Sequence, residues 1–164
     1  MFFRKISYFK FLLESTNQHG VHSPFVFDFV TKGLYHKKII NNIPEKYPAL
    51  KSLTKKEERV LSKIIHYFNI STIHFELVSL NKNLNNKYKL LYIKLSKELI
   101  LDELKKLNSK HFVVVHGIYK DKKTKLKWLE IIKKTEDIVT IDLFYFGIIF
   151  FRKEQAKEHF NIRV

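Results

Sequence analysis

The stretch HFVVVH, residues 111–116, decides the fold of this chain, because it places four apolar residues in a row between two histidines. A continuous apolar run rich in β-branched residues is typical of a strand that is covered on both faces of a sheet. Residues 122–134 carry apolar side chains at helical spacing and predict a helix. Residues 138–144 and 147–152 then predict two strands joined by a tight turn, an antiparallel hairpin at the carboxyl end.

Upstream of this stretch, residues 71–78 and 88–94 predict two further strands, and Ser96 is suited to cap a helix that runs through Leu107. Strands that alternate with helices indicate an α/β domain with a mostly parallel sheet of about five strands. The connection 79–87 has nine residues, fewer than an ordinary crossover helix requires. The first two strands therefore pair either in parallel, across an extended connection, or antiparallel.

The amino-terminal segment places Phe2, Ile6, Phe9 and Leu13 at three- and four-residue spacing, which predicts a helix over residues 2–14. This helix is amphipathic and basic, so it can dock on the domain or lie on a membrane surface. Docking is the commoner outcome and is the one that we expect.

Two short motifs predict further helix starts. The pair SP at 23–24 predicts a helix to about residue 34, because serine can cap free amides and proline lacks the amide that would be orphaned. The motif TKKE at 54–57 has the spacing of a capping box and predicts a helix over residues 55–68.

The length of 164 residues suits one compact unit, with helices and an irregular linker over residues 1–53 and a reduced α/β domain over 54–164. The apolar content of 45% excludes a disordered chain. The longest apolar run, 141–151, is interrupted by Asp142 and is too short for a membrane-spanning helix, so no transmembrane segment is expected. With no cysteine and no secretion signal, a cytoplasmic location is the default expectation.

The net charge of +15 would draw the chain toward nucleic acid, ribosomes or an anionic membrane surface. The basic residues are nearly all lysine, and lysine, isoleucine and asparagine are abundant together, as they would be under an AT-rich coding bias. A surface that reads bases or phosphates usually relies on arginine, whose planar fork pairs two acceptors. Coding bias is therefore favoured over specific nucleic-acid recognition, while attraction to nucleic acid or to an anionic membrane stays open.

Two long segments carry a family resemblance: NQHGVHSPFVFDFVTK at 17–32 and VTIDLFYFGIIFFRKEQAKEHFNIRV at 139–164. Both resemble class I S-adenosylmethionine-dependent methyltransferase-like proteins of Bacteroidetes, which are related in fold to small-molecule O-methyltransferases. The resemblance implies a seven-stranded Rossmann-like sheet with the cofactor at the ends of the first strands. It also implies a glycine loop after the first strand and acidic residues after the second, fourth and fifth.

This chain departs from that pattern at each cofactor element. The glycine loop corresponds to residues 75–80, where Glu76 and Leu77 persist but valine and leucine replace the glycines. Glycine lets the backbone approach a cofactor closely, so side chains here close that approach. Lys94 stands where the family has an acid, HGIY at 116–119 replaces an acidic pair, and the short connection removes the ribose carboxylate.

We therefore expect a truncated, degenerate methyltransferase-like sheet with N-terminal helices and no bound cofactor, with S-adenosylmethionine as the cofactor if activity is retained. No catalytic residue is assigned and the cofactor-binding residues are unknown, with Glu76 and Ser79 as remnant candidates. The expected function is a non-catalytic structural or regulatory partner. The alternatives are a residual methyltransferase acting on a small molecule or RNA, and a basic module that binds RNA, ribosomes or a membrane surface. An exposed edge of the first strand would suit a homodimer or a protein partner.

The histidines offer only weak chemical signals. His19 and His22 are three residues apart and could bind a metal if a third ligand converged, but helix-start punctuation is the favoured interpretation. His74 and His116, on strands, could face one crevice. Asp142 is expected to pair with lysine, and Trp128 to be a core or an interface residue rather than a platform for stacking bases.

Overall fold

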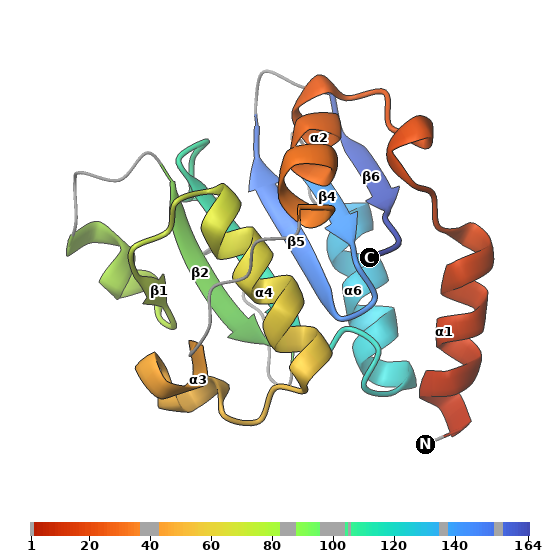
Figure 1. The fold of residues 1–164 in the computed structure, drawn as a ribbon, viewed down its shortest axis with the longest axis horizontal. Helices are drawn as coiled ribbons and strands as arrows, with labels where there is room; N and C mark the ends of the chain where they lie inside the picture. The colour runs from red at the N-terminus through yellow and green to blue at the C-terminus, as the bar shows by residue number, and fades with distance from the viewer. Residues whose placement is uncertain are drawn as a thin grey trace.

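A computed structural model describes residues 2–36, 43–82, 88–95, 104, 106–134, 138–152 and 156–164 of the chain. A six-stranded sheet of order β1-β2-β3-β5-β4-β6 has α2 and α4 over one face and α6 over the other (Figure 1). The strands are β1 Ile73–His74, β2 Lys89–Lys94, β3 His111–His116, β4 Ile138–Asp142, β5 Phe146–Phe151 and β6 Glu158–Asn161. The helices are α1 Phe2–Glu14, α2 Pro24–Asp28, η2 Phe29–Leu34, α3 Ile43–Lys46, α4 Lys55–Tyr67 and α6 Lys122–Lys134, with shorter turns η1 Gln18–Gly20, η3 Pro48–Leu50 and η4 Leu77–Lys82.

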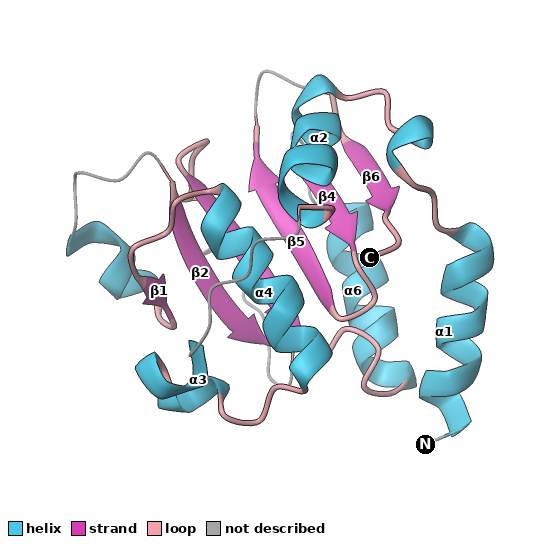
Figure 2. Cartoon of the chain, in the orientation of Figure 1, coloured by secondary structure: helices cyan, strands magenta, loops and turns pink. Residues whose placement is uncertain are grey.

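Strand β3 explains the layering shown in Figure 2, because its consecutive apolar residues point alternately to the two faces. Phe112 and Val114 join the core beneath α2 and α4, whereas Val113 and Val115 join the core beneath α6. All four side chains are fully buried. The prediction of a strand covered on both faces is confirmed.

The carboxyl-terminal hairpin is also confirmed, with β4 antiparallel to β5. Strand β5 lies between β3 and β4 and is antiparallel to both, whereas β1 with β2, β2 with β3 and β4 with β6 pair in parallel. The expected count of about five strands is wrong, because the tail contributes β6. Phe160, Ile162 and Val164 alternate with polar residues there, and the strand pairs in parallel with β4 at the edge of the sheet.

The first strand is much shorter than predicted, with two residues where 71–78 was expected. It pairs in parallel with β2, which settles the open question of direction. At the outer edge of β1, the Ile73 amide donates to the Tyr47 hydroxyl at 3.0 Å. At the opposite edge of the sheet, Thr16 bridges to Ile162, beyond β6. Residues from the amino-terminal part of the chain therefore lie along both edges.

Helix α1 docks on the domain, but through the face opposite to the predicted stripe. Phe11 is buried among Tyr119 and Phe144, with ring centroids 6.2 and 5.6 Å away, and Ser7 is buried beside it. Phe2, Ile6, Phe9 and Leu13 are exposed instead. Periodicity identified an apolar stripe correctly and assigned it to the wrong side, because the aromatic contacts that hold the helix come from Phe11 and Tyr8 on the other face.

The remaining helices agree in part with expectation. The capping box is confirmed: the Glu57 amide donates to Thr54 Oγ1, and the Thr54 amide donates to Glu57 Oε2. The second helix starts at Pro24 as predicted, but the Ser23 side chain makes no cap bond. The supposedly irregular linker contains α3 and η3, while its residues 37–42 and most of the predicted helix 96–107 lie outside the described residues. Over the described residues, no helix combines the length and apolar character that crossing a membrane requires.

A close contact between α6 and β5 supplies a stability test. An added Cβ at Gly147 would lie 2.5 to 2.7 Å from the Trp128 ring, which is itself buried in the core as expected. Gly147→Ala should therefore lower the free energy of unfolding by about 1 to 3 kcal/mol in urea denaturation, as overpacking does. Lys123→Ala, on the exposed side of α6, is the control and should change it by no more than about 0.5 kcal/mol. A Gly147→Ala variant as stable as the wild type would contradict this packing.

Candidate functional site

The candidate site lies at the carboxyl ends of β3 and β4, the edge at which ligands bind in open α/β sheets. A cavity of about 220 Å³ opens there beside Glu57 and His116, with Arg4 and Lys120 as basic groups and Tyr119 and Phe144 as aromatic walls. Arg4 comes from α1, Glu57 from the first turn of α4 and His116 from the end of β3. The fold therefore gathers three distant segments at one strand end.

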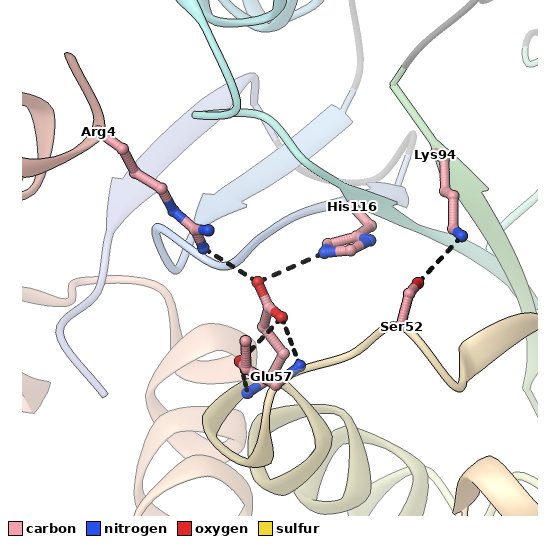
Figure 3. Close-up of polar contacts among 6 residues, drawn as sticks. Arg4, Ser52, Glu57, Lys94 and His116 are labelled. Carbon is pink, nitrogen blue, oxygen red and sulfur yellow. Dashed lines mark hydrogen bonds and ion pairs between the residues drawn. The ribbon is translucent and has the colours of Figure 1, made fainter. Parts of the chain in front are cut away.

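Glu57 is the centre of this site, as Figure 3 shows. Its Oε1 accepts a hydrogen bond from Arg4 Nη2 at 3.0 Å and lies 3.4 Å from His116 Nε2. Its Oε2 accepts from the amide and the hydroxyl of Thr54, each at 2.8 Å. Both oxygens are thus engaged, and the side chain is only 5% exposed. A carboxylate bound in this way is held still and is not free to ligate a metal or take a proton.

The same contacts determine the ionisation of Glu57. Burial by itself raises the pKa of the carboxyl group, but the hydrogen bonds from His116 and Thr54 outweigh it and lower the pKa to about 2. The carboxylate is therefore charged throughout the physiological pH range.

Two further polar groups lie at the end of β2. Lys94 donates to Ser52 Oγ at 3.3 Å. The Tyr92 hydroxyl is buried and has no hydrogen-bond partner among the described residues. Burial raises the pKa of Tyr92, and the Glu57 charge raises it further, so the phenol stays protonated. Neither side chain supplies the negative charge that would hold a ribose.

Asp142, at the end of β4, forms a second buried network. Its Oδ2 accepts from the Tyr119 hydroxyl at 2.9 Å and from Trp128 Nε1 at 3.1 Å, and its Oδ1 accepts from the Phe144 amide at 2.7 Å. The expectation that Asp142 pairs with lysine is therefore wrong. Burial raises its pKa to about 6, although the three donors partly offset that effect.

The hairpin turn depends on this aspartate. Phe144 has φ of 64°, a left-handed conformation that is unfavourable for a bulky residue. The bond from its amide to Asp142 and its ring contacts with Tyr8 and Tyr119, at 4.8 and 4.7 Å, compensate for that conformation. The turn thus places an aromatic ring at the wall of the cavity.

Glu76 and Ser79, which the sequence offered as remnant cofactor contacts, lie on the segment after β1 and do not contact Glu57. The Ser79 hydroxyl donates to the Glu76 carbonyl at 2.6 Å, and His74 Nδ1 lies 3.1 Å from the Ser79 oxygen. The Glu76 side chain is exposed. His74 therefore contacts Ser79, whereas His116 contacts Glu57. The cavity is lined by His116 and not by His74, so the two histidines do not share it.

His19 and His22 are both exposed at the turn before α2. Asn17 caps that turn by accepting the His19 amide at 3.0 Å, and an added Cβ at Gly20 would lie 2.1 Å from Thr16 Oγ1. Over the described residues, no group of three or more histidine, aspartate or glutamate side chains is placed to hold a metal ion.

Sequence reasoning found Glu57 only as a helix cap and missed its contacts with Arg4 and His116. The one available signal was the capping box itself, because it fixes the glutamate at the start of a helix that packs on the sheet. No acid lies within four residues of His116 in the sequence, and its carboxylate partner comes from α4 instead.

Comparison with protein-family models, curated proteins and solved structures gave no match.

The low pKa of Glu57 predicts a specific acid dependence of stability. Because the folded pKa is about 2 and the ordinary value 4.5, the contribution is present above pH 4.5 and is lost as the pH falls toward 2. Glu57→Gln should lower the free energy of unfolding at neutral pH by about 1 to 3 kcal/mol, and the deficit should shrink across that interval. Urea denaturation of the variant and the wild type at several pH values between 2 and 7 measures this difference in the free energy of unfolding.

The matched control is Glu58→Gln, the same chemical change one residue along α4. It should leave both the neutral stability and the acid dependence close to those of the wild type. A Glu57→Gln deficit that stays constant from pH 7 to pH 2 would contradict the assigned ionisation.

The raised pKa of Asp142 can be followed through Trp128, the single tryptophan of the chain. Since the folded pKa of about 6 exceeds the ordinary value of 3.8, the contribution of Asp142 to stability is present below pH 3.8 and is lost as the pH rises through 6. Tryptophan emission should change with a midpoint near pH 6, because the indole N–H donates to the titrating oxygen. Tyr119→Phe removes one donor and should move the midpoint upward.

Asp142→Asn should abolish this emission change, and Asp121→Asn, on the exposed start of α6, should preserve it. A titration near pH 6 that survives in Asp142→Asn would assign the transition to another group.

Proposed function

We propose that this chain is a methyltransferase-like α/β protein that no longer binds S-adenosylmethionine and serves as a non-catalytic structural or regulatory partner. The observation that carries the proposal is the segment after β1, where the resemblance implies a glycine loop. That segment is the helical turn η4, closed by the bond from Ser79 to the Glu76 carbonyl. Leu80 is buried in the core on the α6 side of the sheet, so this segment packs a side chain into the domain where the resemblance implies bare glycine backbone.

The strand order supports the same proposal. In doubly wound sheets the nucleotide lies in the crevice where the strand order reverses. Here the chain proceeds from β1 through β2 to β3 in one direction, and within the described residues β1 is the outermost strand. The Tyr47 hydroxyl accepts the outward Ile73 amide, so a side chain from the α3 region lies where the other half of a crevice would start.

The charges at the strand ends support it further. The resemblance implies acidic groups that would hold a ribose or order a metal. At two of those positions this chain has Lys94, which is bound to Ser52, and His116, which lies beside Glu57. Glu57 itself is engaged on both oxygens by Arg4 and Thr54. The site's own side chains thus satisfy one another, which suits a structural role.

One observation favours residual catalysis as the second candidate. His116 faces both the cavity and the Glu57 carboxylate, an arrangement that orients a histidine to accept a proton from a substrate hydroxyl. A methyltransferase acting on a small molecule or RNA would need such a base together with the methyl donor.

Calorimetric titration separates the two candidates. The non-catalytic proposal predicts no saturable heat with S-adenosylmethionine or S-adenosylhomocysteine at micromolar concentrations. A methyltransferase with an intact glycine loop, titrated under the same conditions, is the positive control. Saturable binding, or ligand density beside residues 77–80 in a soaked crystal, would overturn the proposal and favour residual catalysis.

A further inference from the structure

The outward face of α1 is an apolar stripe that no described part of the domain covers. The exposed fractions are 79% for Phe2, 42% for Ile6, 65% for Phe9 and 73% for Leu13. At about 100° per residue these four positions fall on one side of the helix. Contiguous exposed apolar surface of this kind marks an interaction site in a folded protein.

The stripe faces outward because the other side of α1 is firmly held. Phe11 is buried against Tyr119 and Phe144, and Arg4 forms an ion pair with Glu57 at 3.0 Å. The Tyr8 ring lies 4.8 Å from that of Phe144. With these contacts in place, the helix cannot rotate to bury the stripe without breaking the Glu57 pair.

The charged residues of α1 indicate which kind of partner the apolar stripe binds. Lys5 and Lys10 are exposed and flank the stripe on its two sides, and Glu14 at the end is the only acid of the helix. Long lysine side chains beside an apolar face can reach phosphate groups while the apolar side chains enter the acyl boundary. The net charge of +15 adds a general attraction to an anionic surface.

Other occupants fit these charges less well. A second copy docked through its own stripe would bring lysines toward lysines, with no acid on the stripe to pair them, and like charges disfavour such a contact. Single-stranded RNA stacks its bases on aromatic rings in a basic groove, whereas Ile6 and Leu13 offer no stacking surface.

We propose that the outward face of α1 is a docking surface for an anionic lipid bilayer, with Phe2, Ile6, Phe9 and Leu13 inserted at the interface and Lys5 and Lys10 at the headgroups. The helix lies in the plane of the surface and the α/β domain stays outside it. This surface is separate from the strand-end cavity, so it functions whether or not a cofactor binds there.

Vesicle co-sedimentation of the full chain tests this docking. The wild type should bind phosphatidylcholine vesicles containing phosphatidylglycerol, bind phosphatidylcholine alone weakly, and lose affinity as salt rises. The Phe9→Ser/Leu13→Ser variant should reduce the partition coefficient at least about tenfold, since two apolar side chains no longer enter the acyl boundary. Lys5→Glu/Lys10→Glu should also reduce it at least about tenfold on anionic vesicles, because two positive charges near the headgroups become negative.

The matched control is Val78→Ser, which changes a residue of the same exposure, 74%, on η4. In Figure 1, η4 lies at the β1 end of the sheet and α1 lies at the β6 end. Val78→Ser should bind vesicles like the wild type. Circular dichroism and thermal unfolding of Phe9→Ser/Leu13→Ser should match those of the wild type, because neither side chain packs in the core.

Absence of binding to anionic vesicles would overturn the proposal, and so would equal binding by Phe9→Ser/Leu13→Ser. Light scattering distinguishes the remaining possibility. A wild-type dimer that becomes a monomer in Phe9→Ser/Leu13→Ser, without vesicle binding, would assign the stripe to a second copy of the chain instead.

Discussion

The carboxylate of Glu57 is the interaction on which the arrangement of this protein depends. It links α1 through Arg4, the start of α4 through Thr54 and the end of β3 through His116. A buried charge is tolerated only when it is paired and hydrogen-bonded. Moving any one of these three partners away would leave the buried carboxylate of Glu57 short of a contact, so Glu57 fixes all three segments together. At the strand-end edge, where α/β proteins usually accept a ligand, the protein's own side chains therefore bind one another beside the cavity.

Asp142 plays a comparable part at the end of β4. It holds the turn at Phe144, and the Phe144 ring in turn receives Phe11 and Tyr8 from α1. The amino-terminal helix is thus fixed at both carboxylates, by an ion pair at Arg4 and by aromatic contacts at the hairpin turn. The direction in which its apolar stripe points follows from these two attachments rather than from the helix's own periodicity.

The sequence predicts an element correctly where the element leaves a pattern in consecutive residues. The run 111–116, the helix 122–134 and the capping box at 54–57 were all predictable, because burial on two faces, helical spacing and a reciprocal cap each leave a pattern in consecutive positions. The buried face of α1 and the contacts of Glu57 were not predictable, since each depends on a partner far away in the chain. The pairing of Asp142 was missed for the same reason: its partners are Tyr119 and Trp128, which the hairpin meets only in the folded state. Strand β6 was missed although Phe160, Ile162 and Val164 alternate with polar residues.

The amino-terminal residues along the sheet edges also bear on how this chain avoids aggregation. Tyr47 occupies the outward amide of β1, while Thr16 donates to the Asn161 carbonyl and accepts the Arg163 amide beyond β6. The strand FGIIFF at 146–151 carries no charge and would be a strong template for intermolecular β-pairing if it were exposed. Its position between β3 and β4 keeps it interior, and the edge residues protect the strands around it. During synthesis the first fifty residues emerge before that strand, so the groups that will later shield the sheet are present before the segment that most needs shielding.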